Sequence, residues 1–376
     1  MSVSDPVKQG EGVHAYISYR VTTKTNLSQY KYNQCSVIRR YSDFEWLSGR
    51  LAEKNVGIII PPIPEKSAVE KFRFSPGFIE DRRRSLHEFI NRVAKHPALR
   101  MSTDLQLFLE ASEEVWLTET KYAMAMTKKK SHSPMQLIRG WQESAKAFIS
   151  GRKDEELEPE EYLKLKQYMN ELEGHLGELH RQSARVLKKQ LSHAKALNDV
   201  GTGMILLGEC ESGELTESFR RAGDKAAEIS KASQKLVTEL HANFEQPLKG
   251  LLQSVDSVKA VMNDRSDALA RISHLESSIN AKKLRLGKLR ADPLKSDRVP
   301  QCQRELEDLT QLLSEANEQY QLIVERMRSE IARWQKEKST DLQHLLREFA
   351  SSNAKLAKYS ASVWESLSMG TQSHEI

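Results

Sequence analysis

Three short motifs in the first hundred residues carry side chains that can bind phosphate groups. They are Arg39-Arg40-Tyr41-Ser42-Asp43-Phe44, Pro61-Pro62-Ile63-Pro64-Glu65-Lys66 and Arg82-Arg83-Arg84. A guanidinium group can donate two parallel hydrogen bonds to a phosphate, an ammonium group supplies a compact charge, and an aromatic ring offers a flat wall. Arg40, Tyr41, Lys66 and Arg82 are therefore candidate ligands for a small ring that bears several phosphates.

The residues around these motifs predict a small α+β domain over residues 1–112. Residues 14–21 alternate, with Ala15, Ile17, Tyr19 and Val21 on one face, as in a half-buried strand. Residues 3–7 and 35–38 are expected to add two strands, which gives a small antiparallel sheet.

Helices are expected to complete this domain. Ser42 is predicted to cap the first helix, with Glu45 completing a capping box and Tyr41 and Trp46 in the positions of a hydrophobic staple. Ser75-Pro76 is typical of a second helix start, and residues 105–109 form a third, short helix. Residues 113–134 are interpreted as a linker because they contain three consecutive lysines and a Ser-Pro breaker.

Two helical regions of different scale follow. Residues 135–153 place apolar side chains at three- and four-residue steps, which predicts a short amphipathic helix. Residues 159–368 predict three long helices of about 50, 75 and 65 residues, each too long to bury its apolar stripe within a globule. An all-α three-helix antiparallel coiled coil that dimerises is the expected fold, with a bend at Pro247.

Composition narrows the function. The chain has 376 residues, and its whole formal excess of +5 lies in residues 1–112, which hold 17 Lys+Arg against 12 Asp+Glu. The three cysteines are far apart, which favours a reducing compartment, and neither a secretory signal nor a spanning segment is recognised. We find no catalytic motif, and we expect no enzyme activity, no metal or other cofactor, and no nucleic-acid binding.

The same motifs carry a family resemblance. Arg-Arg-Tyr-Ser-Asp-Phe, then Pro-Pro-x-Pro-x-Lys, then Arg-x-x-x-Leu on a helix resembles the phox-homology (PX) domain, and the residues after 135 resemble the BAR domain of the sorting nexins. The resemblance covers nearly the whole chain. It is strongest to the retromer-associated sorting nexins of the first type, in particular the short plant-like members, although the long N-terminal extension of many relatives is not expected here.

The resemblance implies roles for the candidate ligands. Arg40 would bind the 3-phosphate of phosphatidylinositol 3-phosphate, Tyr41 would pack against the inositol ring, Lys66 would contact the 1-phosphate, and Arg82 the 4- and 5-hydroxyls. Helical phase alone leaves Arg83 and Arg84 open as alternatives to Arg82. A purely structural interpretation also stays open, in which Tyr41 is a staple residue and the arginines are surface charges.

Other residues are candidates for membrane contact. An interfacial loop is suggested by Val69, Phe72 and Phe74, although the two phenylalanines could equally belong to the core. The resemblance favours membrane insertion of the amphipathic helix through Met135, Ile138, Trp141 and Phe148. Basic clusters that could face anionic lipid consist of Arg185, Lys188, Lys189, Lys282, Lys283, Arg285 and Lys288.

The sequence therefore predicts a peripheral protein on the cytosolic face of endosomal membranes. Its expected partners are phosphatidylinositol 3-phosphate, anionic membrane surface, retromer core subunits, and a second copy or a related sorting nexin. The rival hypothesis is a structural coiled-coil scaffold whose N-terminal domain binds a protein instead of lipid.

Overall fold

The computed structural model describes residues 1–12, 15–66, 74–130, 160–291 and 297–371. The chain divides into two compact units, each made of two stretches of sequence. The first unit contains Met1–Met169 and Asp256–Arg333, and the second contains Asn170–Val255 and Trp334–Ile376.

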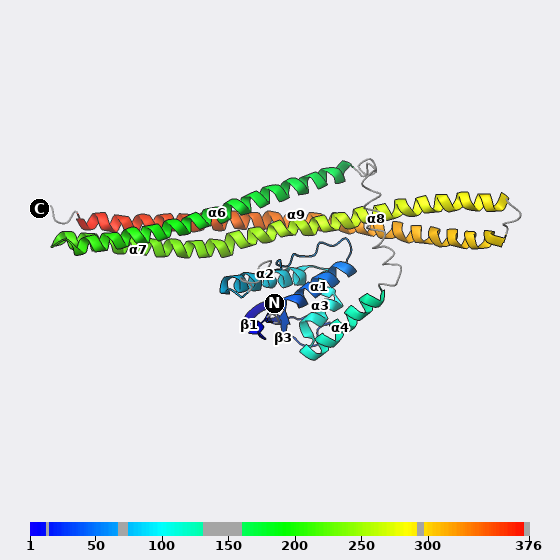
Figure 1. The fold of residues 1–376 in the computed structure, drawn as a ribbon, viewed down its shortest axis with the longest axis horizontal. Helices are drawn as coiled ribbons and strands as arrows, with labels where there is room; N and C mark the ends of the chain where they lie inside the picture. The colour runs from blue at the N-terminus through cyan, green and yellow to red at the C-terminus, as the bar shows by residue number, and fades with distance from the viewer. Residues whose placement is uncertain (13–14, 67–73, 131–159, 292–296, 372–376) are drawn as a thin grey trace. The chain divides into compact units, whose positions relative to one another are not determined.

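A three-stranded antiparallel sheet opens the first unit, in the order β1 (Ser2–Gln9), β2 (Tyr16–Lys24) and β3 (Gln34–Arg40). Figure 1 labels β1 and β3 close to the N-terminus. The predicted inward face of β2 is confirmed, since Ala15, Ile17, Tyr19 and Val21 are all buried. Pairing of Tyr19 with Arg39 and of Ser18 with Arg40 puts these two arginines on opposite faces of the sheet.

In the described residues, five helices follow this sheet along the chain. They are α1 (Tyr41–Lys54), α2 (Pro76–Lys95), the 3₁₀ helix η3 (Leu99–Met101), α3 (Thr103–Glu110) and α4 (Glu113–Lys130). Their shared core includes Phe44, Leu47, Leu86, Phe89 and Phe108, with edge-to-face contacts between the rings. The structure confirms the α+β class that the sequence predicted.

The predicted start of α1 was wrong by about half a turn. The N-cap is Arg40 and not Ser42, because the backbone N–H of Arg40 donates to the Asp43 carboxylate at 2.8 Å. Asp43 thus serves the role predicted for Glu45, two residues earlier in the sequence. Tyr41 becomes the first helical residue, so it is no longer in the staple position.

The linker interpretation of residues 113–134 missed a helix. Over Glu113–Lys130 the chain forms α4, whose Trp116 is buried in the core of the sheet domain. Trp116 packs edge-to-face on Trp46 with ring centroids 4.8 Å apart. This partner of Trp46 lies 70 positions away in sequence, which is why a local staple pattern could not reveal it.

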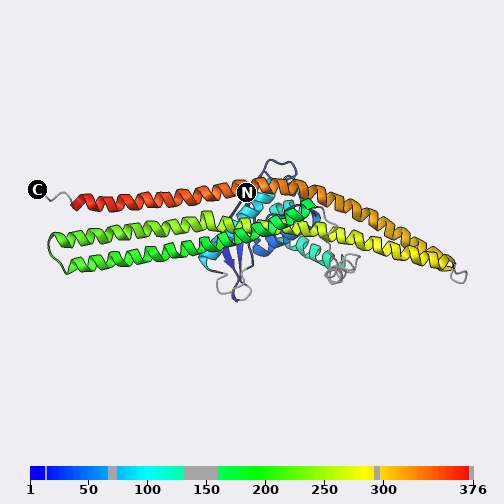
Figure 2. The ribbon, with the colours of Figure 1, turned by 90° about the horizontal axis from the view of Figure 1, so that it is seen from above.

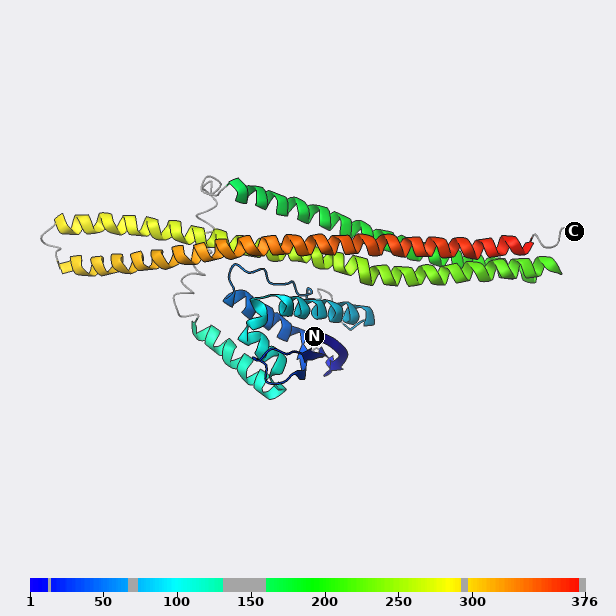
Figure 3. The same ribbon diagram turned by 180° about the vertical axis from the view of Figure 1, so that it is seen from behind.

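Long helices form the remainder of both units. They are α6 (Glu160–Glu209), α7 (Glu214–Leu240), the π-helix η5 (His241–Glu245), α8 (Gln246–Ala291) and α9 (Val299–Thr371). In the first unit α8 pairs with α9 (Figure 3) through Ile272, Leu275 and Ala316, and again through Leu286, Leu289 and Cys302. The start of α6 is held there by Tyr162, whose hydroxyl donates to Met262 O at 2.9 Å.

In the second unit α6 and α7 form a hairpin beside the end of α9 (Figure 2). The two helices approach closely at paired glycines: a Cβ on Gly201 would lie 2.8 Å from Gly223 O, and one on Gly223 would lie 2.5 Å from Gly201 O. Nearby, Ser230 donates to Ala194 O at 2.6 Å. Gly201 is therefore a packing residue of this hairpin.

A π-helical turn lies at the position where a bend was predicted from Pro247. Proline lacks an N–H group, and its ring collides with the carbonyl four residues earlier in an α-helix. The wider turn of η5, His241–Glu245, lies immediately before Gln246-Pro247 and relieves this conflict without ending the helical path.

Within the first unit, Glu330 of α9 connects the helices to the sheet domain. Its carboxylate is buried and accepts from Ile59 N at 3.1 Å, from His96 Nε2 at 3.0 Å and from Arg333 at 2.7 Å. Burial by itself would raise the pKa of Glu330, but the hydrogen bonds from His96 and Arg333 outweigh it and lower that pKa from 4.5 to about 2.

This pKa predicts acid sensitivity. Because the native carboxylate binds its proton less readily than the unfolded one, its stabilising contribution is complete above pH 4.5 and is lost as the pH falls towards 2. Urea unfolding of the wild type at pH 5 and pH 3 should show this loss. Glu330→Gln should reduce the difference in the free energy of unfolding between pH 5 and pH 3. Glu325→Gln, at an exposed acid of the same helix, should leave this difference unchanged.

Candidate anion-binding site

Three of the four predicted ligands meet beside the loop that follows α1. The guanidinium carbon of Arg82 lies 4.3 Å from the centroid of the Tyr41 ring, and Arg82 Nη2 donates to Glu65 O at 3.2 Å. The Tyr41 hydroxyl donates to Pro64 O at 2.6 Å. Lys66 follows Glu65 in the same segment and pairs with Glu45 at 2.9 Å. The fold thus assembles residues that are up to 41 positions apart.

Arg40 stands at the junction of β3 and α1, next to Tyr41. Its side chain is 49% exposed, lies 3.6 Å from Asp43, and is positioned over the ring of Tyr16 at 5.6 Å. Strand alternation explains this exposure, because Arg40 shares the outer face of the sheet with Tyr16. The guanidinium is therefore held at its base and remains accessible to an anion.

The geometry favours Arg82 over its two neighbours on α2. Arg82 is buried between the rings of Tyr41 and Phe78, at 4.3 and 4.4 Å. Arg83 is bound to Glu80 at 2.8 Å and donates to Val3 O at 2.7 Å, so its hydrogen bonds are made within the domain. Arg84 lies 3.6 Å from the same glutamate. Only Arg82 among the three contacts the ring of Tyr41 in the described part of the chain.

Burial fixes the protonation of Tyr41. Desolvation, with a smaller contribution from Glu45, raises the pKa of Tyr41 to about 12. The phenol therefore keeps its proton near neutral pH and can maintain its hydrogen bond to Pro64 O. The neutral ring of Tyr41, with the buried guanidinium of Arg82 stacked on it, forms a rigid wall. Such a wall suits a hydroxyl-bearing ring whose phosphates reach Arg40 and Lys66.

The neighbouring Arg39 has a different environment. Its side chain is 1% exposed, and its guanidinium lies over the rings of Trp116 and Phe108 at 4.5 and 5.5 Å. Its donors reach Phe108 O, Ile38 O and Ala111 O at 3.0, 2.9 and 2.7 Å. The interpretation of Arg39 as a surface charge at a strand end is therefore wrong.

Most of the residues predicted to insert into a membrane lie outside the described part of the chain. These are Val69, Phe72, Met135, Ile138, Trp141 and Phe148. Phe74 is described: it is partly buried against the core of the sheet domain, with Lys8 Nζ 4.8 Å from its ring. This packing agrees with the core alternative for Phe74.

The predicted basic clusters lie on two helices. On α6, Arg185, Lys188 and Lys189 are exposed in the second unit. On α8, in the first unit, Lys282 pairs with Glu305, whereas Lys283, Arg285 and Lys288 are exposed. Leu284 stands among these cations with 71% of its surface exposed, and sequence analysis did not single it out. Tyr16 and Phe78 were also missed, although strand alternation could have placed Tyr16 beside Arg40.

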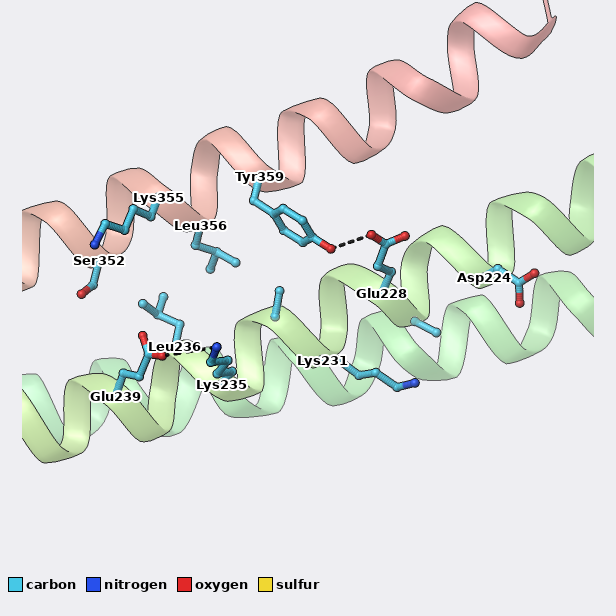
Figure 4. A pocket seen from close by; sticks show the side chains of 12 residues that line it. Asp224, Glu228, Lys231, Lys235, Leu236, Glu239, Ser352, Lys355, Leu356 and Tyr359 are labelled. Atoms are coloured by element: carbon cyan, nitrogen blue, oxygen red, sulfur yellow. Dashed lines mark hydrogen bonds and ion pairs between the residues drawn. The ribbon is translucent and has the colours of Figure 1, made fainter.

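A groove between α7 and α9 in the second unit offers a volume of about 670 Å³ (Figure 4). Leu236 and Leu356 line it, and Tyr359 donates to Glu228 at 2.5 Å. Its charges balance, since three lysines face Asp224, Glu228 and Glu239. A groove without a positive excess does not suit a phosphate-bearing ligand.

Comparisons with known proteins identify a family for each of the two regions of the chain. The PX domain family matches residues 28–112, and the family described as Vps5 C terminal like matches residues 142–369. The chain is 41% identical to Sorting nexin 1 of Arabidopsis thaliana over 98% of its own length and 91% of the relative's. Human Sorting nexin-30 is 27% identical, with 97% of this chain and 76% of the relative aligned. The fold is similar to that of the SNX-BAR Mvp1 tetramer, with a TM-score of 0.69, 17% identity, and coverage of 97% of this chain and 99% of the other.

These matches define a protein that combines a PX domain with a BAR domain of the Vps5 type. The chain belongs to the sorting nexin family. Its domain pair makes it a membrane-binding scaffold of endosomal sorting that recognises phosphoinositides, dimerises and is not an enzyme. Across the described helices, none combines the length and apolar character that crossing a bilayer requires.

Proposed function

We propose that this sorting nexin binds phosphatidylinositol 3-phosphate through Arg40, Tyr41, Lys66 and Arg82. The observation that carries the proposal is the stacking of Arg82 on Tyr41 at 4.3 Å beside the backbone of Pro64 and Glu65. This arrangement provides a wall for the inositol ring and a buried cation for its hydroxyls. Arg40, half exposed at the start of α1, would receive the 3-phosphate, and Lys66 would exchange Glu45 for the 1-phosphate.

Liposome sedimentation tests the proposal directly. The purified chain should pellet with liposomes that contain phosphatidylinositol 3-phosphate. It should pellet much less with control liposomes of the same total charge, in which phosphatidylserine is the only anionic lipid. Equal sedimentation with both would reduce the role of the N-terminal domain to general charge attraction. No sedimentation with either would favour the rival hypothesis, a scaffold whose N-terminal domain binds a protein.

The helical region is proposed to add avidity on curved endosomal membrane. We assign the PX domain to residues 1–112 and the dimerising BAR domain to residues 159–368. Two headgroup sites on one dimer, together with exposed cations such as Lys188 and Lys283, act multivalently. Light scattering of the pure chain, alone and mixed with a related sorting nexin, distinguishes a homodimer from a heterodimer.

Residues 135–153 are proposed to insert into the membrane as an amphipathic wedge. Replacing Trp141 and Phe148 with alanine should reduce the tubulation of liposomes several-fold, because most of the apolar area available for insertion is lost. Electron microscopy of the liposomes measures this effect. Sedimentation in the same assay must stay near the wild-type level; normal tubulation by this folded double variant would contradict the wedge.

Retromer core subunits are the proposed partners in cargo sorting. A pull-down with purified core subunits, with and without liposomes, tests this link. Capture of the core subunits by the wild type, with or without liposomes, would support the link. No capture in either condition would contradict it.

A further inference from the structure

The chain segment that leaves α1 is held by the helices of the first unit. Gly57 has φ +85°, and a Cβ at this position would lie 3.2 Å from Ile323 Cα. The backbone of Gly57 is hydrogen-bonded to Asp264 of α8, and Arg326 of α9 donates to Val56 O at 3.0 Å. Close approach of the two backbones thus requires a glycine, and the segment is fixed on both helices.

A second link comes from His96, just after α2. Its Nδ1 accepts hydrogen bonds from the backbone amides of Ala98 and Leu99, each at 3.2 Å. An accepting nitrogen carries no proton, so Nε2 carries it and donates to both carboxylate oxygens of Glu330 at 3.0 Å. The same carboxylate accepts the amide of Ile59 at 3.1 Å. Glu330 therefore ties both ends of the stretch between α1 and η3 to α9.

The held segment continues directly into the candidate anion-binding site. Five residues beyond Ile59, Pro64 O accepts the Tyr41 hydroxyl, and the next carbonyl, of Glu65, accepts Arg82. Prolines at 61, 62 and 64 fix φ at three of the intervening positions, which makes this connection stiff. A displacement at Ile59 is thus transmitted to the backbone that orients Tyr41, Arg82 and Lys66.

We infer that Glu330 is a positioning residue for the headgroup site, and that contact with α8 and α9 sets the affinity of this site for its ligand. The inference rests on the proposed function, and it adds a regulation to it. A braced loop loses less conformational freedom when a ligand binds, so the docked state has the higher affinity. By linkage, headgroup binding stabilises the docking of the sheet domain on α9, and a rearrangement of these helices changes headgroup affinity.

Two single variants break the link from opposite sides. His96→Asn keeps a side-chain oxygen near the position of Nδ1 and so preserves the cap on Ala98 and Leu99, but its side chain is too short to reach Glu330. Glu330→Ala removes the acceptor on α9. Titration calorimetry of the full chain with a soluble short-chain phosphatidylinositol 3-phosphate should show roughly three- to tenfold weaker binding for each variant. The double variant should bind no more weakly than the single ones, because both remove the same link.

Controls separate this role from general stability. Glu325→Ala removes an exposed acid of the same helix and should bind as the wild type does. Hydrogen exchange should accelerate at Ile59–Lys66 in His96→Asn and stay unchanged in β2. Wild-type binding that is lost in Arg40→Ala but unchanged or tighter in His96→Asn and Glu330→Ala would overturn the positioning role alone. Failure of the wild type to bind the ligand would overturn the proposed function itself. If Glu330→Ala does not fold, His96→Asn decides.

Discussion

Replacing Arg40 with alanine should weaken binding to phosphatidylinositol 3-phosphate by about 100-fold, because truncating one partner of a close charge pair costs about 2–3 kcal/mol. The stability of the folded chain should change little. The side chain is 49% exposed, its contact with Asp43 is a surface pair, and the helix cap uses the backbone N–H of residue 40, which alanine retains.

Arg20 provides a matched control for this prediction. It lies on the same face of the sheet, is 50% exposed, and pairs with Asp5 at 2.8 Å. Arg20→Ala removes the same charge and should reduce sedimentation with the 3-phosphate lipid only slightly. Thermal unfolding should show both variants within a few degrees of the wild type. Equal binding by Arg40→Ala and Arg20→Ala would contradict the assigned role of Arg40.

Replacing Arg39, one residue earlier, should instead unfold the sheet domain. Arg39→Ala leaves the carbonyls of Phe108 and Ala111 without their donor and opens a cavity beside Trp116. The expected loss is about 3–5 kcal/mol, from buried carbonyls that lose their donor and from the cavity, and it is a large part of the stability of a domain of this size. Arg39→Lys should recover little, because an ammonium group cannot reproduce the planar fork that serves three carbonyls.

Hydrogen exchange and ligand binding distinguish the role of Arg39 from that of Arg40. Burial lowers the pKa of Arg39 to about 10, so its guanidinium stays charged near neutral pH and its hydrogen bonds are present there. Hydrogen exchange in β2 and β3 should become fast in Arg39→Ala even without lipid, whereas Arg40→Ala should show native protection and lose only the ligand. Native protection in Arg39→Ala would show that the buried fork is dispensable.

Regular elements and their inner faces followed from the sequence because local periodicity specifies them. Alternation placed Ile17 and Tyr19 in the core, and the three long helices expected over residues 159–368 are close in length to the observed helical stretches. The helix start at Ser42 was mispredicted by two residues because two acids, Asp43 and Glu45, both had suitable capping spacing, and only the backbone direction at Arg40 decides between them.

Contacts between distant residues had no local signal. Nothing near Arg39 indicates that Trp116 will cover it, and nothing near His96 indicates a carboxylate 234 positions away. The choice among Arg82, Arg83 and Arg84 likewise depended on which of them faces Tyr41.

The sequence by itself determined the class of this protein, its domain pair and the set of cations from which a phosphate site could be made. Tertiary structure alone decided which cation is buried, which is exposed, and which residues of α9 contact the segment that follows α1. The reason is physical: side-chain type and spacing act over a few residues, whereas the environment of a charge is set by whatever the fold brings within a few ångströms of it.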